Sequence, residues 1–187
     1  ADDLRNATNE NWSGVYPSGA YAMGGAGDDF YFGIRRYPYS VDMSKNPLTF
    51  KHIQDGTALP SGIRSAFGQG GEQNSEVHNT GEVWASMLWE CYVSLLRDPR
   101  LSFTEAQKRM KGYLIASLKL TPIDPDFREA RDAVLAAAMA KDKVDFELFA
   151  NAFARRGAGV GSKAPAKDAE GNKGVVESFV TGNDVAF

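Results

Sequence analysis

The sequence has few of the side chains that most often carry out catalysis, with two histidines and one cysteine among its 187 residues. A single cysteine excludes a disulfide framework within the chain. No apolar run approaches the roughly 20 residues that a membrane-spanning helix requires. The 21 basic and 24 acidic side chains give a net charge of -3, which provides no basic surface for nucleic acid. We therefore expect a globular protein without a nucleic-acid or membrane partner, whose chemistry depends on His52, His78 or carboxylates.

Glycine and aromatic residues divide the chain into three parts. Of the 19 glycines, 11 lie in residues 1–74, two in 75–156 and six in 157–187. The first part also holds ten of the 21 aromatic residues. Frequent turns with apolar anchors between them predict irregular but ordered structure there, with one short strand around 31–34.

The middle part has the apolar spacing of helices. The first helix is predicted at 75–97, with one apolar stripe along it. A second helix should start at Ser102, which has Glu105 at capping-box spacing. Asp124 before a proline predicts the third start, and a fourth helix should begin near Asp145 and stop at Gly157. The expected inward-facing residues are Val77, Trp84, Leu88, Cys91 and Leu95, then Ala106, Met110, Tyr113, Leu114, Ser117 and Leu118, then Phe127, Ala130, Val134 and Ala138, and finally Phe146, Phe149 and Phe153.

The predicted fold is therefore mainly α-helical. An irregular segment rich in glycine and aromatic residues occupies 1–74, a four-helix subdomain occupies 75–157, and a loop-like tail occupies 158–187. The tail is small, polar and aperiodic, and its last apolar residues are expected to dock as a short extended segment.

His78 is the histidine with carboxylates at helical spacing around it. It falls in the first turn of the first predicted helix, and Glu82 follows one turn later on the same face. One interpretation is a surface pair of His78 with Glu82. The other is an imidazole that projects from the helix into a cleft. A catalytic zinc site is disfavoured on this face because it requires three protein ligands and two are present.

The other candidate groups have structural interpretations. His52 has no carboxylate or second histidine at a recognisable spacing, and Cys91 lies on the apolar stripe, where it is expected to be a small buried residue. The run Gly24-Gly25-Ala26-Gly27 lacks the context of a phosphate-binding loop. Arg35 and Arg36 are either a solvated pair or a clamp for a carbonyl or carboxylate group.

Three segments together resemble the carboxy-terminal part of the catalytic unit of fungalysin-type zinc metallopeptidases, which are relatives of thermolysin. In order, they cover roughly residues 30–160, and the middle segment is the most specific. They are YFGIRRYPYS followed by NPLTF at 31–50, SEVHNTGEVWA at 75–85, and LTP, DFREARDA and AFARRGAG between 120 and 159.

The resemblance implies a secreted endopeptidase that acts on proteins or peptides. In this family two histidines of an H-E-x-x-H motif and a downstream glutamate hold the zinc, and the motif glutamate activates water. The sequence contains none of these groups, so they are expected upstream of Ala1. The chain would then be the helical C-terminal portion that forms one wall of the cleft. Its partner would be the N-terminal half of the same catalytic unit, and alone it would bind no zinc and be inactive.

The same resemblance assigns roles to two residues. His78 corresponds to the histidine that donates a hydrogen bond to the oxyanion of the tetrahedral intermediate. Arg36, with Arg35 as the alternative, corresponds to an arginine that binds a substrate backbone carbonyl. Thermolysin has an aspartate five residues before this histidine that orients the ring, whereas Gln73 stands there in this sequence. The orienting carboxylate is therefore missing or comes from Glu72, Glu76 or Glu82.

A competing hypothesis needs no catalysis. The chain could be a helical binding module in which the aromatic residues of the first third form a partner surface. An exposed aromatic face of this kind would also allow the fragment to dimerise.

Overall fold

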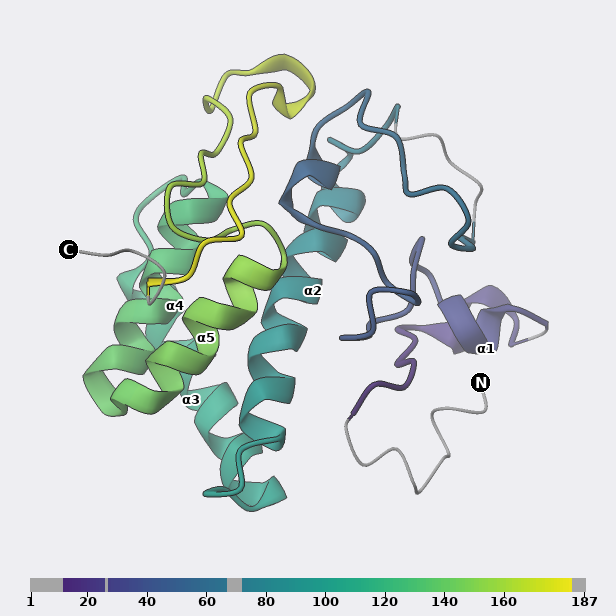
Figure 1. The fold of residues 1–187 in the computed structure, drawn as a ribbon. Coiled ribbons are helices and arrows are strands. Elements are labelled where there is room, and N and C mark those ends of the chain that lie inside the picture. The colour runs from purple at the N-terminus through teal and green to yellow at the C-terminus, as the bar shows by residue number, and fades with distance from the viewer. Residues whose placement is uncertain (1–11, 26, 67–71, 183–187) are drawn as a thin grey trace.

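The computed structural model describes residues 12–25, 27–66 and 72–182. Four long helices dominate these residues: α2 (Val77–Leu96), α3 (Phe103–Leu120), α4 (Phe127–Lys141) and α5 (Lys143–Arg155). Each helix packs against the next, and α5 returns to α2, so the four form a closed assembly. The first third of the chain lies on the opposite side of α2 from α3, α4 and α5 (Figure 1). The predicted mainly helical fold is confirmed.

Side-chain caps explain where three of these helices begin. Ser102 accepts from the Glu105 amide at 3.2 Å at the start of α3, and Asp142 accepts from the Val144 amide at 2.9 Å at the start of α5. The prediction of Asp124 as the cap of α4 is wrong. Asp126 is the cap and forms a reciprocal capping box with Glu129, whose carboxylate accepts from the Asp126 amide at 2.9 Å.

The position before a proline explains this error. A residue before proline is disfavoured in the α region, and Asp124 adopts a φ of 52°. Its exposed carboxylate lies two residues before Asp126, the residue that caps α4. Among the described residues, no helix is both long and apolar enough to cross a membrane.

The core lies between the four helices and the first third of the chain, which contributes Leu48 and Phe50 to it. The predicted inward faces are largely correct, because Cys91, Leu95, Tyr113 and Phe149 are all buried. Two predicted core positions are wrong: Val77 is 73% exposed and Leu118 is 75% exposed. Val77 lies in the first turn of α2, where it lines an open groove, and Leu118 lies near the end of α3.

The first third contains a helix where a strand was expected. The predicted strand at 31–34 is wrong, because Asp29–Phe32 form the single helical turn α1. Isolated bridges join Ser18 to Gly33 and Tyr16 to Tyr39, and the described residues contain no continuous strand. Gly33 has a φ of 60°, and a Cβ there would collide with the Ser18 carbonyl oxygen. The close contact between the backbones of Ser18 and Gly33, and not pairing within a sheet, therefore determines the local structure.

Arg156, at the end of α5, binds the irregular first third to the helices. Its side chain is 0% exposed. It donates to the backbone carbonyls of Ser40 at 2.6 Å, Asn46 at 2.7 Å and Leu48 at 2.9 Å, and to the Glu90 carboxylate of α2 at 2.8 Å. These buried carbonyls have no sheet or helix partners, so the guanidinium supplies their hydrogen bonds.

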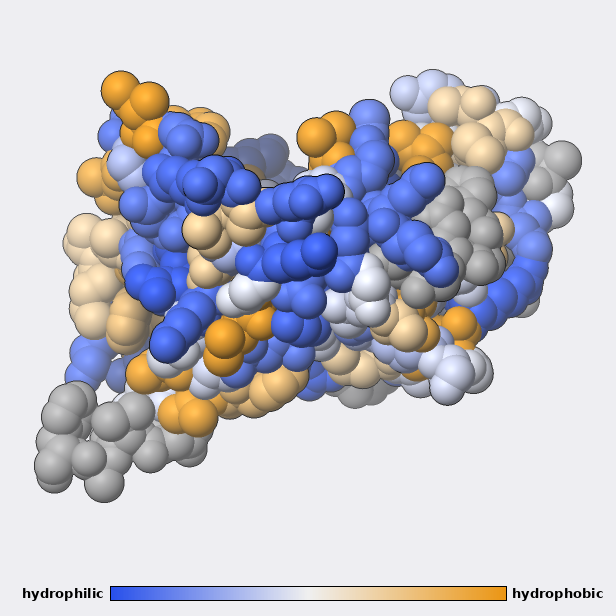
Figure 2. Space-filling model, turned by 90° about the horizontal axis from the view of Figure 1, so that it is seen from above, coloured by the Kyte–Doolittle hydropathy of each residue, from blue (hydrophilic) through white to orange (hydrophobic). Residues whose placement is uncertain are grey.

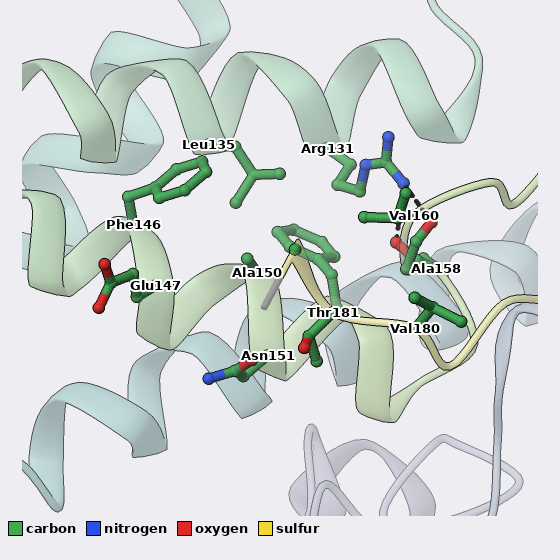
Figure 3. Close-up of a pocket in the computed structure, with 13 residues that line it drawn as sticks. Arg131, Leu135, Phe146, Glu147, Ala150, Asn151, Ala158, Val160, Val180 and Thr181 are labelled. Carbon is green, nitrogen blue, oxygen red and sulfur yellow. Dashed lines mark hydrogen bonds between the residues drawn. The ribbon is translucent and has the colours of Figure 1, made fainter. Parts of the chain in front are cut away.

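The segment after α5 folds back over the helices and the first third. Arg131 of α4 donates to the carbonyls of Ala158 at 2.8 Å and Gly159 at 3.0 Å (Figure 3). Near the chain end, the Lys51 amide donates to the Glu177 carboxylate at 2.8 Å. Of the apolar residues expected to dock, Val175 is buried, while Val176, Phe179 and Val180 stay 42–58% exposed.

An apolar hollow lies between this segment, α4 and α5. Leu135, Phe146 and Ala150 line it on the helix side, and Val160 and Val180 line it on the other (Figure 3). The first turn of α2 contributes nothing to it. The hollow therefore lies apart from His78.

We predict that Arg156→Ala lowers the free energy of unfolding by about 3–5 kcal/mol, because it leaves the Glu90 carboxylate buried without its main partner. Urea denaturation measures this change. Arg155→Ala is the matched control. Its side chain is 50% exposed, and its loss should cost no more than about 1 kcal/mol. Equal losses for both variants would contradict the anchoring role of Arg156.

Candidate functional site

The first turn of α2 holds His78 in a defined position. Glu76 is the N-cap of the helix, and its Oε2 accepts from the backbone amides of His78 at 2.9 Å and Asn79 at 3.2 Å. Its Oε1 lies 2.7 Å from His78 Nδ1. One carboxylate therefore satisfies two of the free amides of the helix start and also contacts the ring. The predicted pairing of His78 with Glu82 is wrong.

The contact with Glu76 fixes which ring nitrogen carries a proton. Hydrogen bonds from His78, and from the amides of Asn79 and His78, hold the pKa of the Glu76 carboxyl below its usual value. An ionised carboxylate can only accept, so Nδ1 of His78 is the donor in this pair. The side chain of His78 is 72% exposed, and within the described residues no protein group bonds Nε2. The second ring nitrogen is therefore available to a ligand.

Arg36 and Glu82 form a buried ion pair directly below this turn. Arg36 Nε lies 2.7 Å from Glu82 Oε2, and its two terminal nitrogens donate to Asn74 Oδ1 at 2.7 Å and to the Asn79 carbonyl at 3.1 Å. The other oxygen of Glu82 accepts from the Tyr37 amide at 2.8 Å. Burial raises the pKa of the Glu82 carboxyl, and the charge and hydrogen bonds of Arg36 oppose that rise. The pair joins the segment around Arg36 to α2.

The loop before α2 is fixed from its other side. The Asn74 side-chain amide donates to the carbonyls of Gln54 at 3.0 Å and Thr57 at 2.8 Å. Asp55 accepts from both the amide and the hydroxyl of Ser75 at 2.7 Å. Sequence reasoning missed Asn74 and Asp55, because nothing in their local pattern shows contacts to residues so far along the chain. Together they hold the start of α2 rigidly.

Arg35 and Arg36 differ in how their donors are used. Each of the three guanidinium nitrogens of Arg36 bonds to the protein, and its side chain is 2% exposed. Arg35 is half-buried, and its Nε is buried without a hydrogen-bond partner in the described structure. A buried donor without a partner is costly in free energy. Arg35 is therefore the arginine of this pair with an unused donor.

The first turn of α2 lies at the surface, since Val77 and His78 are both exposed. This end of the molecule faces the viewer in Figure 2. A shallow groove runs beside the His78 turn, with Val77 and Gly81 of α2 on one side and Pro125 and Phe127 on the other. His78 thus lies where a large ligand has access to it.

The family model for fungalysin metallopeptidases (M36) matches residues 2–162. The chain belongs to this family. Extracellular metalloproteinase 10 of Coccidioides posadasii is 30% identical over 94% of this chain and 26% of its own length. The extracellular metalloproteinase mep of Aspergillus terreus is 34% identical over 74% of the chain, and that of Aspergillus fumigatus is 31% identical over 92%. This fungalysin chain spans about a quarter of the length of these relatives.

Fungalysins are zinc enzymes, and the described residues of this chain do not fit that ion. They contain no group of three or more histidine, cysteine, aspartate or glutamate side chains that could hold a metal. The carboxylates nearest to His78 in sequence are engaged by protein groups, Glu76 by the helix start and Glu82 by Arg36.

The second histidine and the cysteine of this fungalysin chain are structural, as expected. His52 is 8% exposed, and its Nδ1 accepts from the Thr49 amide at 2.9 Å. Burial lowers the pKa of His52. Cys91 is 0% exposed, and burial raises the pKa of its thiol well above the usual value. Neither group is placed for chemistry at the surface.

Proposed function

We propose that this chain is the C-terminal portion of an extracellular zinc metalloendopeptidase, and that it contributes one wall of the cleft and the histidine that stabilises the oxyanion. The observation that carries the proposal is His78. Its ring is exposed, held on a rigid helix start by Glu76, and has Nε2 available. It lies within the part of the chain that the fungalysin model matches.

The proposed chemistry uses His78 as a hydrogen-bond donor. When water attacks a peptide carbonyl, negative charge develops on the carbonyl oxygen. A donor fixed in advance at the position of that charge stabilises the transition state more than the ground state. His78 Nε2–H would donate to this oxygen, while Nδ1–H remains bonded to Glu76. The rigidity of the α2 start means that little reorganisation is needed as the charge appears.

The arginine assignment also belongs to the proposal. The carbonyl contact expected of Arg36 would have to be made by a buried guanidinium that already bonds Glu82, Asn74 and Asn79. We therefore propose that the two neighbouring arginines, Arg35 and Arg36, have different roles. Arg36 holds the segment against α2, and Arg35, whose side chain is only half-buried, binds the backbone carbonyl of the substrate through the exposed part of its guanidinium.

The remaining parts of the enzyme are proposed to lie outside these 187 residues. The zinc ligands and the catalytic glutamate would belong to an upstream N-terminal half, which faces His78 across the cleft. The substrates would be proteins or peptides. The extracellular location is supported by the relatives, which are named extracellular metalloproteinases and are much longer than this chain.

In the complete enzyme, His78→Ala is expected to lower kcat by about 10² to 10³-fold, because it removes a donor to the oxyanion. Steady-state cleavage of a fluorogenic peptide measures the change. Val77→Ala is the control in the same turn, since Val77 is 73% exposed, and its kcat should stay within about twofold. Unchanged turnover in a folded His78→Ala protein would favour the binding-module hypothesis instead.

The two arginines should give opposite results. Arg36→Ala should lower the free energy of unfolding by about 3–5 kcal/mol, because Glu82 is left charged and buried. Arg35→Ala should leave stability nearly unchanged and raise KM by about tenfold, because a charged hydrogen bond to the substrate is lost. Denaturation curves and peptide kinetics on both variants test this. A rise in KM for Arg36→Ala at unchanged stability would reverse the assignment.

Metal analysis tests where the zinc is held. The complete enzyme should contain one zinc per chain, whereas these 187 residues, purified alone and folded by circular dichroism, should contain none, because the three ligands of a catalytic site are absent from them. One tightly held zinc in the isolated chain would contradict the proposed upstream location of the ligands.

A further inference from the structure

The His78 ring needs a partner that fixes its orientation, and the position that supplies one in thermolysin-like enzymes is Gln73 here. A neutral amide cannot supply the charge of a carboxylate. The Gln73 backbone carbonyl is also engaged, since it accepts from the Asn79 side chain at 2.9 Å. An orienting carboxylate on this chain would therefore have to come from another position, Glu72, Glu76 or Glu82.

Glu72, Glu76 and Glu82 are the carboxylates near His78, and the contacts of Glu82 and Glu76 decide which of these two meets the ring. Glu82 is 0% exposed, with one oxygen on Arg36 at 2.7 Å and the other on the Tyr37 amide at 2.8 Å. Both carboxylate oxygens of Glu82 are therefore bonded to groups in the interior and not to His78. Glu76 reaches the ring directly, at 2.7 Å from Nδ1.

We propose that Glu76 is the positioning residue of His78, and that one carboxylate both caps α2 and orients the ring. This inference rests on the proposed role of His78 at the oxyanion. Oε2 is held by the amides of His78 and Asn79, at 2.9 and 3.2 Å. Oε1 of the same rigid group then meets Nδ1. The capping bonds thus fix the carboxylate in place before any substrate binds.

This arrangement has two physical consequences. The carboxylate holds one proton on Nδ1. Nε2, the nitrogen available to the oxyanion, can therefore donate only when the ring carries a second proton and is positively charged. A negative group at the helix N-terminus is itself favourable, because it faces the positive end of the helix dipole. Glu76 and His78 both belong to the start of α2. A shift of the first turn of this helix would therefore move the cap and the ring together.

The test is Glu76→Ser in the complete enzyme. Serine is among the preferred N-cap residues but is too short to reach Nδ1, so helix stability should be retained while the ring loses its partner. The expected result is a fall in kcat of about 10 to 100-fold, with KM little changed, by analogy with the loss of the hydrogen-bond partner of a metal-ligating histidine. Glu76→Asp, which also caps well and is one methylene shorter, is the second variant and should show the same loss.

A double-variant cycle distinguishes positioning from a general structural effect. If Glu76 acts through His78, Glu76→Ser should cause no further loss of kcat in a His78→Ala background. Multiplying losses would overturn the inference, as would unchanged kcat in Glu76→Ser and Glu76→Asp. Failure of the proposed function is recognised separately, because His78→Ala alone would then leave kcat unchanged.

Glu72→Gln is the matched control for the remaining carboxylate. Glu72 is exposed and lies on the same loop before α2. Its replacement should leave both kcat and stability unchanged. A loss of kcat in Glu72→Gln that disappears in the His78→Ala background, with Glu76→Ser unaffected, would assign the positioning role to Glu72 instead.

Discussion

The structure depends on two buried arginines that bind an irregular segment to one helix. The first third has no sheet, so many of its backbone groups need partners from elsewhere. Arg156 donates to three of its carbonyls, and Arg36 and Arg156 each pair with a glutamate on α2, Glu82 at 2.7 Å and Glu90 at 2.8 Å. These glutamates lie two turns apart on the helix. Because an unpaired buried charge is so costly, the register between the first third and α2 is closely fixed.

The position of His78 follows from that register. The Arg36–Glu82 pair lies directly below the first turn of α2, and Asn74 and Asp55 hold the loop that leads into it. Above them, Nδ1 of the ring is bonded to Glu76, the cap of the same turn. The buried ion pair therefore provides a rigid base, and the exposed imidazole is presented on it. An interaction that stabilises the fold also prepares the group proposed to meet the substrate.

Local signals predicted the helices well and their details less well. The apolar spacing gave α2 to α5, because packing of one face is a periodic property of the sequence. The cap of α4 was assigned two residues early, since Asp124 and Asp126 look alike until the backbone before Pro125 is known. The strand at 31–34 was wrong because a run of aromatic residues does not show whether a neighbouring strand exists. Val77 matched the apolar stripe, yet it lines an open groove and stays exposed.

By itself the sequence determined the mainly helical class, the burial of Cys91, and a family resemblance that singled out His78 and the arginine pair. These follow from periodicity and from short motifs, which are local. Only the tertiary structure decided which carboxylate meets which base. Glu82 lies one helical turn from His78, but Arg36, distant in sequence, binds it in the interior, and Glu76 takes the imidazole instead. Burial decides between these partners, because a charge removed from water must pair with a group that the fold places beside it.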